Sequence, residues 1–425
     1  MYLYPNRILQ TMAGGILAMA LLAGAQAPVP PVPAPAATPA PTPTPAAQAP
    51  AAAPSTPPAE TPLSTFVLTG PLQWLPPATF DAGPLGKLSV NGILTGFAQF
   101  QNNPVPGDST AQATLSNGQI FIQKADGKLQ YFIQAGVYTM PTLSMPFINT
   151  QNTVSNFYGP VPVAYLKLQA AKNTQFLIGS LPTLMGAEST FTYQNFNIER
   201  GIVWNQENAI NRGIQVNQTM GKYLSAAFSW NDGYYSNRYS WLSGSVTLTK
   251  GPHSLVYDGM GNTGQTVHVT AATPIANNSY MHAVIYTYTK GPWIISPYFQ
   301  YSKLPTNAAV GVAKGTSVTG GALNVSYAFK SGFSLPARVE YLTSSGNATD
   351  GSVNLLGFGA GSAGTTFTVT PTYQKGGTYL RSDLAWVHAT SYVPGDVFGT
   401  TGSDASQFRA VLEFGFIFGK NIIAK

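Results

Sequence analysis

The stretch QFRAVLEFGFIF, residues 407–418, alternates between two kinds of side chain. Because successive side chains of a β-strand point to opposite sides, it has two different faces. One face is apolar: Phe408, Ala410, Leu412, Phe414, Phe416 and Phe418. The other carries two charges: Gln407, Arg409, Val411, Glu413, Gly415 and Ile417. A soluble sandwich would bury the aromatic face, whereas an outer-membrane barrel would turn it to lipid and the charges to a lumen.

The composition favours the barrel. Only 8% of the 425 residues are charged, against roughly 25% in soluble domains, while the mean hydropathy is only +0.03. Beyond the N-terminus, no uncharged apolar run reaches the roughly 20 residues of a membrane-spanning helix. The formal net charge is +6, but most Lys residues fall at predicted turns, so nucleic-acid binding is not inferred.

The N-terminus has the parts of a secretory signal peptide over residues 1–27. Arg7 precedes an apolar region at 12–22, and the small-residue site Ala25-Gln26-Ala27 follows. Cleavage after Ala27 would leave Pro28 first, so cleavage after Ala25 is the alternative. The sequence therefore predicts an exported protein, and the absence of Cys excludes disulfides and a lipid-anchored cysteine.

Residues 28–62 consist almost wholly of Pro, Ala and Thr, with Glu60 as the one charge. Such a segment lacks the large apolar residues that build a core and predicts a disordered, extended periplasmic arm. It is interpreted as a spacer, with a contact to the cell wall as the alternative. We expect a lead-in segment at 63–86, a barrel at 87–418 and a short tail at 419–425.

From residue 87 onward, alternating segments are joined by seven short turns, each with a Lys: 124–128, 171–174, 219–222, 249–253, 289–293, 330–333 and 374–377. The other eight connections are longer: 102–117, 139–161, 182–212, 232–237, 264–279, 304–316, 345–364 and 390–406. This pattern predicts an all-β fold, a transmembrane antiparallel up-and-down β-barrel of about 16 strands with short periplasmic turns and long extracellular loops.

Ionisable residues recur on the face opposite the apolar one. In FSLPARVEYLT, residues 333–343, Arg338 and Glu340 alternate with apolar side chains, and Arg381 and Asp383 do so in YLRSDLAWVH, residues 379–388. Aromatic residues gather near strand ends, as expected for interfacial girdles: Trp230, Tyr286, Tyr288, Trp293 and Trp386.

No catalytic, metal or cofactor site is predicted. A Gly-x-Gly-x-x-Gly string occurs at Gly359, Gly361 and Gly364, but β-branched strand residues follow it where a dinucleotide site needs a helix. The four His residues, at 253, 268, 282 and 388, have no metal-ligand spacing. An outer-membrane lipid hydrolase stays a less favoured alternative, since it would need a His beside a nucleophile or acid on facing strands.

The segment LIGSLPTLMGAESTFTYQNFNIERGIVWNQENAINRGIQV, residues 177–216, resembles the OmpL-like outer-membrane β-barrel porins. The residues that fit that outline are Gly179, Pro182, Thr183, Gly186, Glu188, Arg200, Gly201 and Gly213. The pattern of Phe414, Phe416 and Phe418 is also similar to the C-terminal assembly signature of porins, although seven residues follow it here. The resemblance implies a passive diffusion porin for small hydrophilic solutes and ions, located in the outer membrane and surrounded by its lipid.

A more distant resemblance is to general 16-stranded trimeric porins, whose third extracellular loop folds into the lumen. Here the third long connection, 182–212, is also the longest, and it carries the predicted pore-constriction residues Glu188, Glu199, Arg200, Glu207 and Arg212. The resemblance implies a homotrimer. An ordinary charged surface loop is the alternative.

The predicted pore wall comprises Lys167, Arg338, Glu340, Arg381, Asp383, Arg409 and Glu413. We expect Glu199 and Glu207 to face cationic wall residues across a narrow opening. The alternative is local pairing of Arg338 with Glu340, Arg381 with Asp383 and Arg409 with Glu413. The mixed signs predict little or mild ion preference. A plugged barrel that acts as an envelope scaffold through its Pro-rich arm is the competing function.

Overall fold

The structure is a computed structural model of the chain and describes residues 70–420. The predicted signal peptide (1–27), the arm (28–62), the start of the lead-in segment (63–69) and the end of the tail (421–425) lie outside the described residues. These assignments, including the cleavage site, stay predictions.

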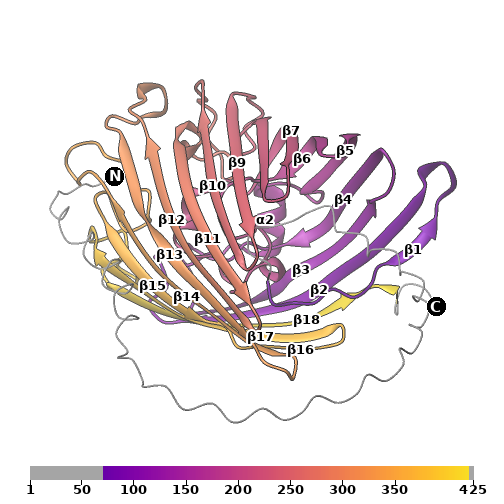
Figure 1. The fold of residues 1–425 in the computed structure, drawn as a ribbon. Helices are drawn as coiled ribbons and strands as arrows, with labels where there is room; N and C mark the ends of the chain where they lie inside the picture. Colours follow the sequence, from indigo (N-terminus) through magenta and orange to yellow (C-terminus); the bar gives the residue numbers. More distant parts are fainter. Residues whose placement is uncertain (1–69, 421–425) are drawn as a thin grey trace, which may run out of the picture. The chain divides into compact units, whose positions relative to one another are not determined.

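Antiparallel β-strands make up most of the described chain (Figure 1). Within residues 70–420, no helix has the length and hydrophobicity needed to cross a bilayer. The strands are β1 (Ala78–Asp81), β2 (Lys87–Gln101), β3 (Ala111–Lys124), β4 (Leu129–Tyr138), β5 (Val163–Ala171), β6 (Thr174–Pro182), β7 (Ile210–Met220), β8 (Leu224–Asn231), β9 (Trp241–Lys250), β10 (His253–Asn262), β11 (Tyr280–Lys290), β12 (Trp293–Leu304), β13 (Thr316–Ala328), β14 (Phe333–Ser344), β15 (Ala363–Val369), β16 (Thr372–Lys375), β17 (Thr378–Ser391) and β18 (Ser406–Phe418). The short helices are α2 (Thr150–Asn156), η1 (Gly83–Leu85), η2 (Thr192–Gln194), η3 (Trp204–Gln206), η4 (Ile275–Asn278) and η5 (Ala308–Val310).

The sheet closes on itself because its last strand pairs with its first long one. β18 runs antiparallel to β2, from Arg409 opposite Gln101 to Phe418 opposite Gly92 (Figure 1). A Cβ on Gly92 would lie 2.4 Å from the Phe418 ring, so glycine at this position makes room for the closing strand. Each strand from β2 to β18 also pairs with its neighbours around the ring, with β15 and β16 sharing one position between β14 and β17, so the predicted barrel is confirmed.

The barrel has sixteen strands, as predicted. β15 and β16 both pair with β14 and β17, so they are two halves of one strand. Pro371, which has no N–H to donate, lies at the break between them. β1 is not a separate barrel strand, because it forms a hairpin with only the first residues of β2.

All seven predicted turns occur, and six contain a glycine with positive φ: Gly127, Gly221, Gly251, Gly291, Gly332 and Gly376. A left-handed backbone of this kind favours glycine, which explains why the turns were recognisable in the sequence. We call this end of the barrel the turn end and the opposite end the loop end. The first long loop is shorter than expected, because β3 already begins at Ala111.

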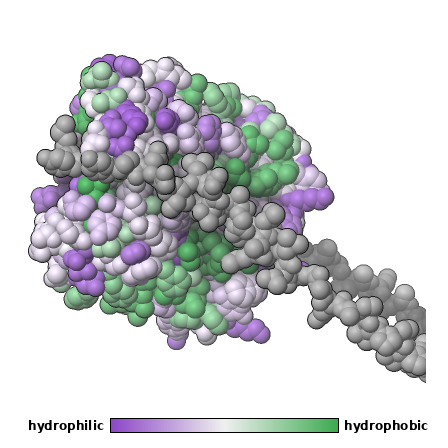
Figure 2. Space-filling view, turned by 90° about the vertical axis from the view of Figure 1, so that its left-hand side faces the viewer, coloured by the Kyte–Doolittle hydropathy of each residue, from purple (hydrophilic) through white to green (hydrophobic). Residues whose placement is uncertain are grey.

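The two faces of β18 lie as the alternation predicts. Phe408, Leu412, Phe414 and Phe416 are 42–49% exposed on the outside, whereas Arg409 and Glu413 are at most 1% exposed on the inside. Figure 2 shows hydrophobic side chains gathered in patches on one side of the molecule, with hydrophilic ones between and around them. The predicted aromatic residues Trp230, Trp293 and Trp386 likewise point outward and are 42–50% exposed.

Candidate functional site in the barrel lumen

The third long loop lies inside the barrel. Residues 183–209, which we call the inner loop, connect β6 to β7 and bury Phe191, Phe196, Ile198 and Ile202 almost completely. Lumen-facing side chains of β12, β14, β17 and β18 bond to this loop, and three arginines make about half of these contacts. The loop is therefore fastened to one side of the barrel wall.

Arg381 on β17 binds the backbone in the middle of the inner loop. Its guanidinium donates to the carbonyl oxygens of Thr192 at 3.0 Å and of Asn195 and Phe196, both at 2.8 Å. Its Nη1 also lies 3.7 Å from Oε2 of Glu413, which is directly opposite on β18. The planar group thus donates to three buried loop carbonyls, of which Thr192 O also accepts from the amide of Asn195 at 3.2 Å.

Arg409 on β18 holds two loops together. Its Nη1 lies 2.9 Å from Oε1 of Glu199 and donates to the carbonyl oxygen of Thr142 at 2.9 Å, while Nη2 donates to Met145 O at 2.7 Å. Thr142 in turn forms a parallel β-bridge with Arg200. Loop 139–162, which contains α2, is therefore connected to the inner loop both by direct backbone hydrogen bonds and through the buried Arg409.

Arg338 on β14 contacts two acids, Glu188 of the inner loop and Glu340 on its own strand, the latter with Nε 3.2 Å from Oε2. Glu340 accepts from the amides of Ile202 and Val203 at 3.2 and 3.1 Å. The intervening chain must approach closely, since a Cβ on Gly201 would lie 1.9 Å from Oε1 of Glu340.

The other charged side chains of this region also have protein partners. Asp383 accepts from the amide of Glu199 at 2.8 Å, and Oε1 of Glu207 accepts from the Tyr298 hydroxyl at 2.5 Å. Arg200 stacks over the Trp204 ring with Cζ 4.4 Å from its centroid. Burial raises the pKa of Glu207 well above its ordinary value, and burial likewise raises the pKa of Glu199 against the lowering influence of Arg409.

These contacts agree with some expectations and correct others. Glu199 does meet a cationic wall residue, Arg409, but in direct contact and not across an opening, whereas Glu207 contacts Tyr298 and, within the described part of the chain, no cation. The local pairs are also different: Arg338 does contact Glu340, but Arg381 contacts Glu413. Two expected pairs, Arg381 with Asp383 and Arg409 with Glu413, are not among the ion pairs of residues 70–420.

Arg212 and Lys167 also differ from the other predicted site residues. Arg212 belongs to β7, opposite Ser180 and on the outward-facing side shared with Ile214, and it pairs with Asp232 at 2.8 Å. It is therefore not a constriction residue. Lys167 does face inward on β5, near the turn end, and within residues 70–420 it forms no ion pair.

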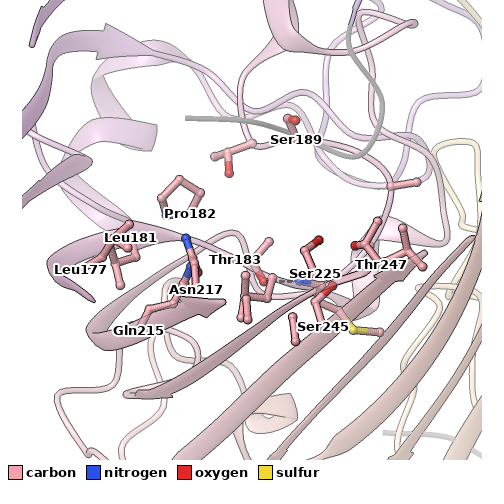
Figure 3. Close-up of a pocket in the computed structure, with 18 of the residues that line it drawn as sticks. Leu177, Leu181, Pro182, Thr183, Ser189, Gln215, Asn217, Ser225, Ser245 and Thr247 are labelled. Atoms are coloured by element: carbon pink, nitrogen blue, oxygen red, sulfur yellow. Dashed lines mark hydrogen bonds between the residues drawn. The ribbon is translucent and has the colours of Figure 1, made fainter. Parts of the chain in front are cut away.

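The free space of the lumen lies on the other side of the inner loop. A cavity of about 440 Å³, which we call the lumenal cavity, separates residues 183–190 from strands β7–β10. Figure 3 shows Ser189 of the inner loop on one side and Ser225, Ser245 and Thr247 on the other. Hydroxyl and amide groups dominate the strand side: Gln215, Asn217, Thr219, Ser225, Ser245, Thr247 and Ser254. The pore wall predicted from the sequence comprises only charged residues and therefore omits these. Polar side chains nevertheless alternate with other residues along 215–219 and 243–247.

The histidines form no metal site, and residues 70–420 contain no group of three His or acidic side chains that could hold a metal ion. His253 and His282 are exposed on the outside and contact tyrosine hydroxyls. His388 Nδ1 lies 2.8 Å from Ser406 Oγ. Within the described range no carboxylate hydrogen-bonds to the His388 ring, so this pair has no third group of the kind that orients the base in hydrolases.

A closed 16-stranded antiparallel barrel with an apolar outside, a polar inside and an inserted loop defines a β-barrel of the porin class. Residues 87–418 match the family described as "Putative beta-barrel porin-2, OmpL-like", and the chain belongs to this family. The match confirms the resemblance seen in the sequence, and membership of a β-barrel porin family implies the outer membrane.

Solved structures agree on the fold. OmpT of Vibrio cholerae expressed in the outer membrane is similar with a TM-score of 0.50 at 11% identity, over 78% of this chain and 98% of that one. The in-vitro folded OmpT gives 0.50 at 12% identity, over 79% and 98%. A search of curated protein sequences found no match.

Proposed function

We propose that the protein allows passive diffusion of small hydrophilic solutes and ions across the outer membrane, with the inner loop narrowing the path. The observation that carries this proposal is the fixed position of the inner loop. Arg338, Arg381 and Arg409 hold it against one side of the lumen, and the lumenal cavity remains on the other side. A polar path through the barrel replaces hydrocarbon with groups that can solvate a passing solute.

In this proposal, four of the predicted constriction and wall residues hold the inner loop in its position. Glu188, Glu199, Arg338 and Arg409 set how far the loop reaches into the lumen, because each lies in a contact between loop and wall. We expect little ion preference, since these charges are paired and mostly buried.

A cysteine-modification experiment tests the route. The chain has no Cys, so Ser245→Cys and Val246→Cys each place a single thiol on β9. Ser245 lines the lumenal cavity, whereas Val246 points outward and is 44% exposed. In planar bilayers, a charged thiol reagent should reduce the single-channel conductance of the Ser245→Cys protein and leave that of Val246→Cys unchanged. A folded wild-type barrel without conductance would refute the proposed function, and equal responses would refute the route.

We further propose that the protein is exported through a cleaved signal peptide and assembles as a homotrimer. N-terminal sequencing of the mature protein would locate the cleavage after Ala25 or Ala27, and light scattering of the detergent complex would give the number of subunits. Monomers under conditions that retain the fold would contradict the trimer.

A scaffold function is a second candidate, and one observation favours it. The middle of the lead-in segment packs against lumenal side chains: Leu72 is 5% exposed, and Trp74 makes edge contacts with Phe121 and Tyr193 at 5.3 and 5.6 Å between ring centroids. A barrel plugged in this way would show no conductance, and deletion of residues 28–62 would produce an envelope defect through a lost cell-wall contact. Conductance together with an intact envelope after that deletion would exclude the scaffold.

A further inference from the structure

The inward-facing side chains divide the lumen into two chemically different parts. On β14, β17 and β18, the charged residues Arg338, Arg381 and Arg409 are at most 1% exposed and are covered by the inner loop. On β7–β10, the side chains that line the lumenal cavity carry no charge. A solute in the cavity therefore meets the uncharged part of the wall.

Among the described residues that line the lumenal cavity, Glu188 is the one acidic or basic residue, and its carboxylate has partners. It contacts the Arg338 guanidinium and accepts from the amide of Gly201 at 2.8 Å, which leaves its side chain 11% exposed. The cavity thus faces a neutral ion pair at this point. Two other inward-facing ionisable residues of this side, Asp258 and Lys167, are not among the residues that line the cavity. Asp258 lies behind this lining, is 1% exposed, and hydrogen-bonds to the Ser245 side chain and the Gly186 backbone.

Hydroxyl and amide side chains suit an uncharged solute that has many hydroxyl groups. Ser and Thr hydroxyls both donate and accept hydrogen bonds, and the amides of Gln215 and Asn217 offer two donors and an acceptor each. Such groups can replace the water around a polyol without a net charge. An ion gains much less here, because the side chains that line the cavity offer no unpaired charge to compensate for the water that it loses.

The size of the cavity and its apolar residues also suit an uncharged solute with many hydroxyl groups. Its volume of about 440 Å³ lies in the range of about 300–1,000 Å³ found for small-molecule sites. Ala227 and Val256 lie between the polar residues of the strand side and offer small apolar contacts to the C–H groups of a ring. A saccharide presents both kinds of surface.

We propose that the lumenal cavity is selective for uncharged polyhydroxylated solutes, sugars and polyols, over charged solutes of the same size. The contact surface consists of Gln215, Asn217, Ser225, Ser245, Thr247 and Ser254. This inference rests on the proposed diffusion function and names its substrate class.

Swelling of proteoliposomes in three matched solutes tests the inference on the unmodified protein. Glucose, gluconate and protonated glucosamine share one carbon skeleton but carry zero, negative and positive charge. We expect glucose to enter several-fold faster than both charged compounds. Equal rates for all three would overturn the selectivity and keep the diffusion function, whereas swelling in none of them would overturn both.

Charge placed in the cavity provides the second test. Thr247→Glu and Thr247→Lys should shift the reversal potential in a salt gradient in opposite directions, toward cation and anion preference respectively. The same changes at Thr401, which is exposed in the loop 392–405, serve as controls and should leave the potential unchanged. Reversal potentials that do not respond to either Thr247 variant would overturn the assignment of this cavity as the selective surface.

Discussion

Arg409 and Glu199 are 210 residues apart in sequence, yet Nη1 of the arginine lies 2.9 Å from Oε1 of the glutamate in the interior of the barrel. The same guanidinium donates to Thr142 O and Met145 O of a second loop. A single residue of the closing strand therefore connects the barrel wall to the inner loop and to loop 139–162. The position of the inner loop depends on the folded barrel, because its partners come from strands far along the chain.

Arg409→Gln should destabilise the barrel and loosen the inner loop. Removing one partner of a buried ion pair leaves the other charge uncompensated and typically costs about 3–5 kcal/mol. We expect a lower urea midpoint in detergent micelles, measured by tryptophan fluorescence, and a larger, noisier single-channel conductance. Lys314→Gln is the control, since Lys314 pairs with Asp350 at an exposed position where the loss is about 0–1 kcal/mol. Unchanged conductance would show that Arg409 does not position the loop.

Glu207→Gln should remove a pH dependence of stability without altering ion preference. Burial raises the pKa of Glu207, so the folded chain binds more protons than the unfolded one above the unfolded-state pKa of about 4.3. Stability from this group therefore decreases as the pH rises from that value through the folded-state pKa. Unfolding midpoints measured across this range should fall less steeply in Glu207→Gln. A large change in reversal potential would instead place the carboxylate in the ion path.

The sequence was sufficient for the barrel because lipid outside and water inside impose a period of two on every strand. Phe408, Leu412 and Phe414 point outward for this reason, and glycine turns set the strand limits. The lumen was harder to predict, because the partner of a charged residue depends on register. Arg381 meets Glu413 since the two residues are opposite each other on β17 and β18, whereas Asp383, on its own strand, bonds to the inner loop.

Leu72→Ala combined with Trp74→Ala should increase conductance. Trp74 touches Tyr193 of the inner loop, and Gly70 N donates to Gln194 O at 3.0 Å, so this segment supports the loop from the turn end. Loss of these contacts should widen the path and increase the open-channel current. Trp293→Ala, which removes an outward tryptophan that is 45% exposed, is the control and should leave the current unchanged. A double variant with wild-type current would mean that the lead-in segment does not restrict the path.

Leu412→Arg should impair folding into a bilayer, because it tests the aromatic and aliphatic face of the closing strand directly. Leu412 is 47% exposed and lies near the middle of β18, opposite Ala98 on β2. An arginine on the lipid face of a barrel costs about 2–4 kcal/mol at the bilayer midplane. Refolding into vesicles, followed by the mobility shift of the folded barrel on electrophoresis without boiling, should give a reduced folded fraction. Thr401→Arg adds the same charge to an exposed loop and should refold like the wild type. Equal folding of both variants would show that lipid does not cover this face, and Phe408, Phe414 and Phe416 would then need a protein partner.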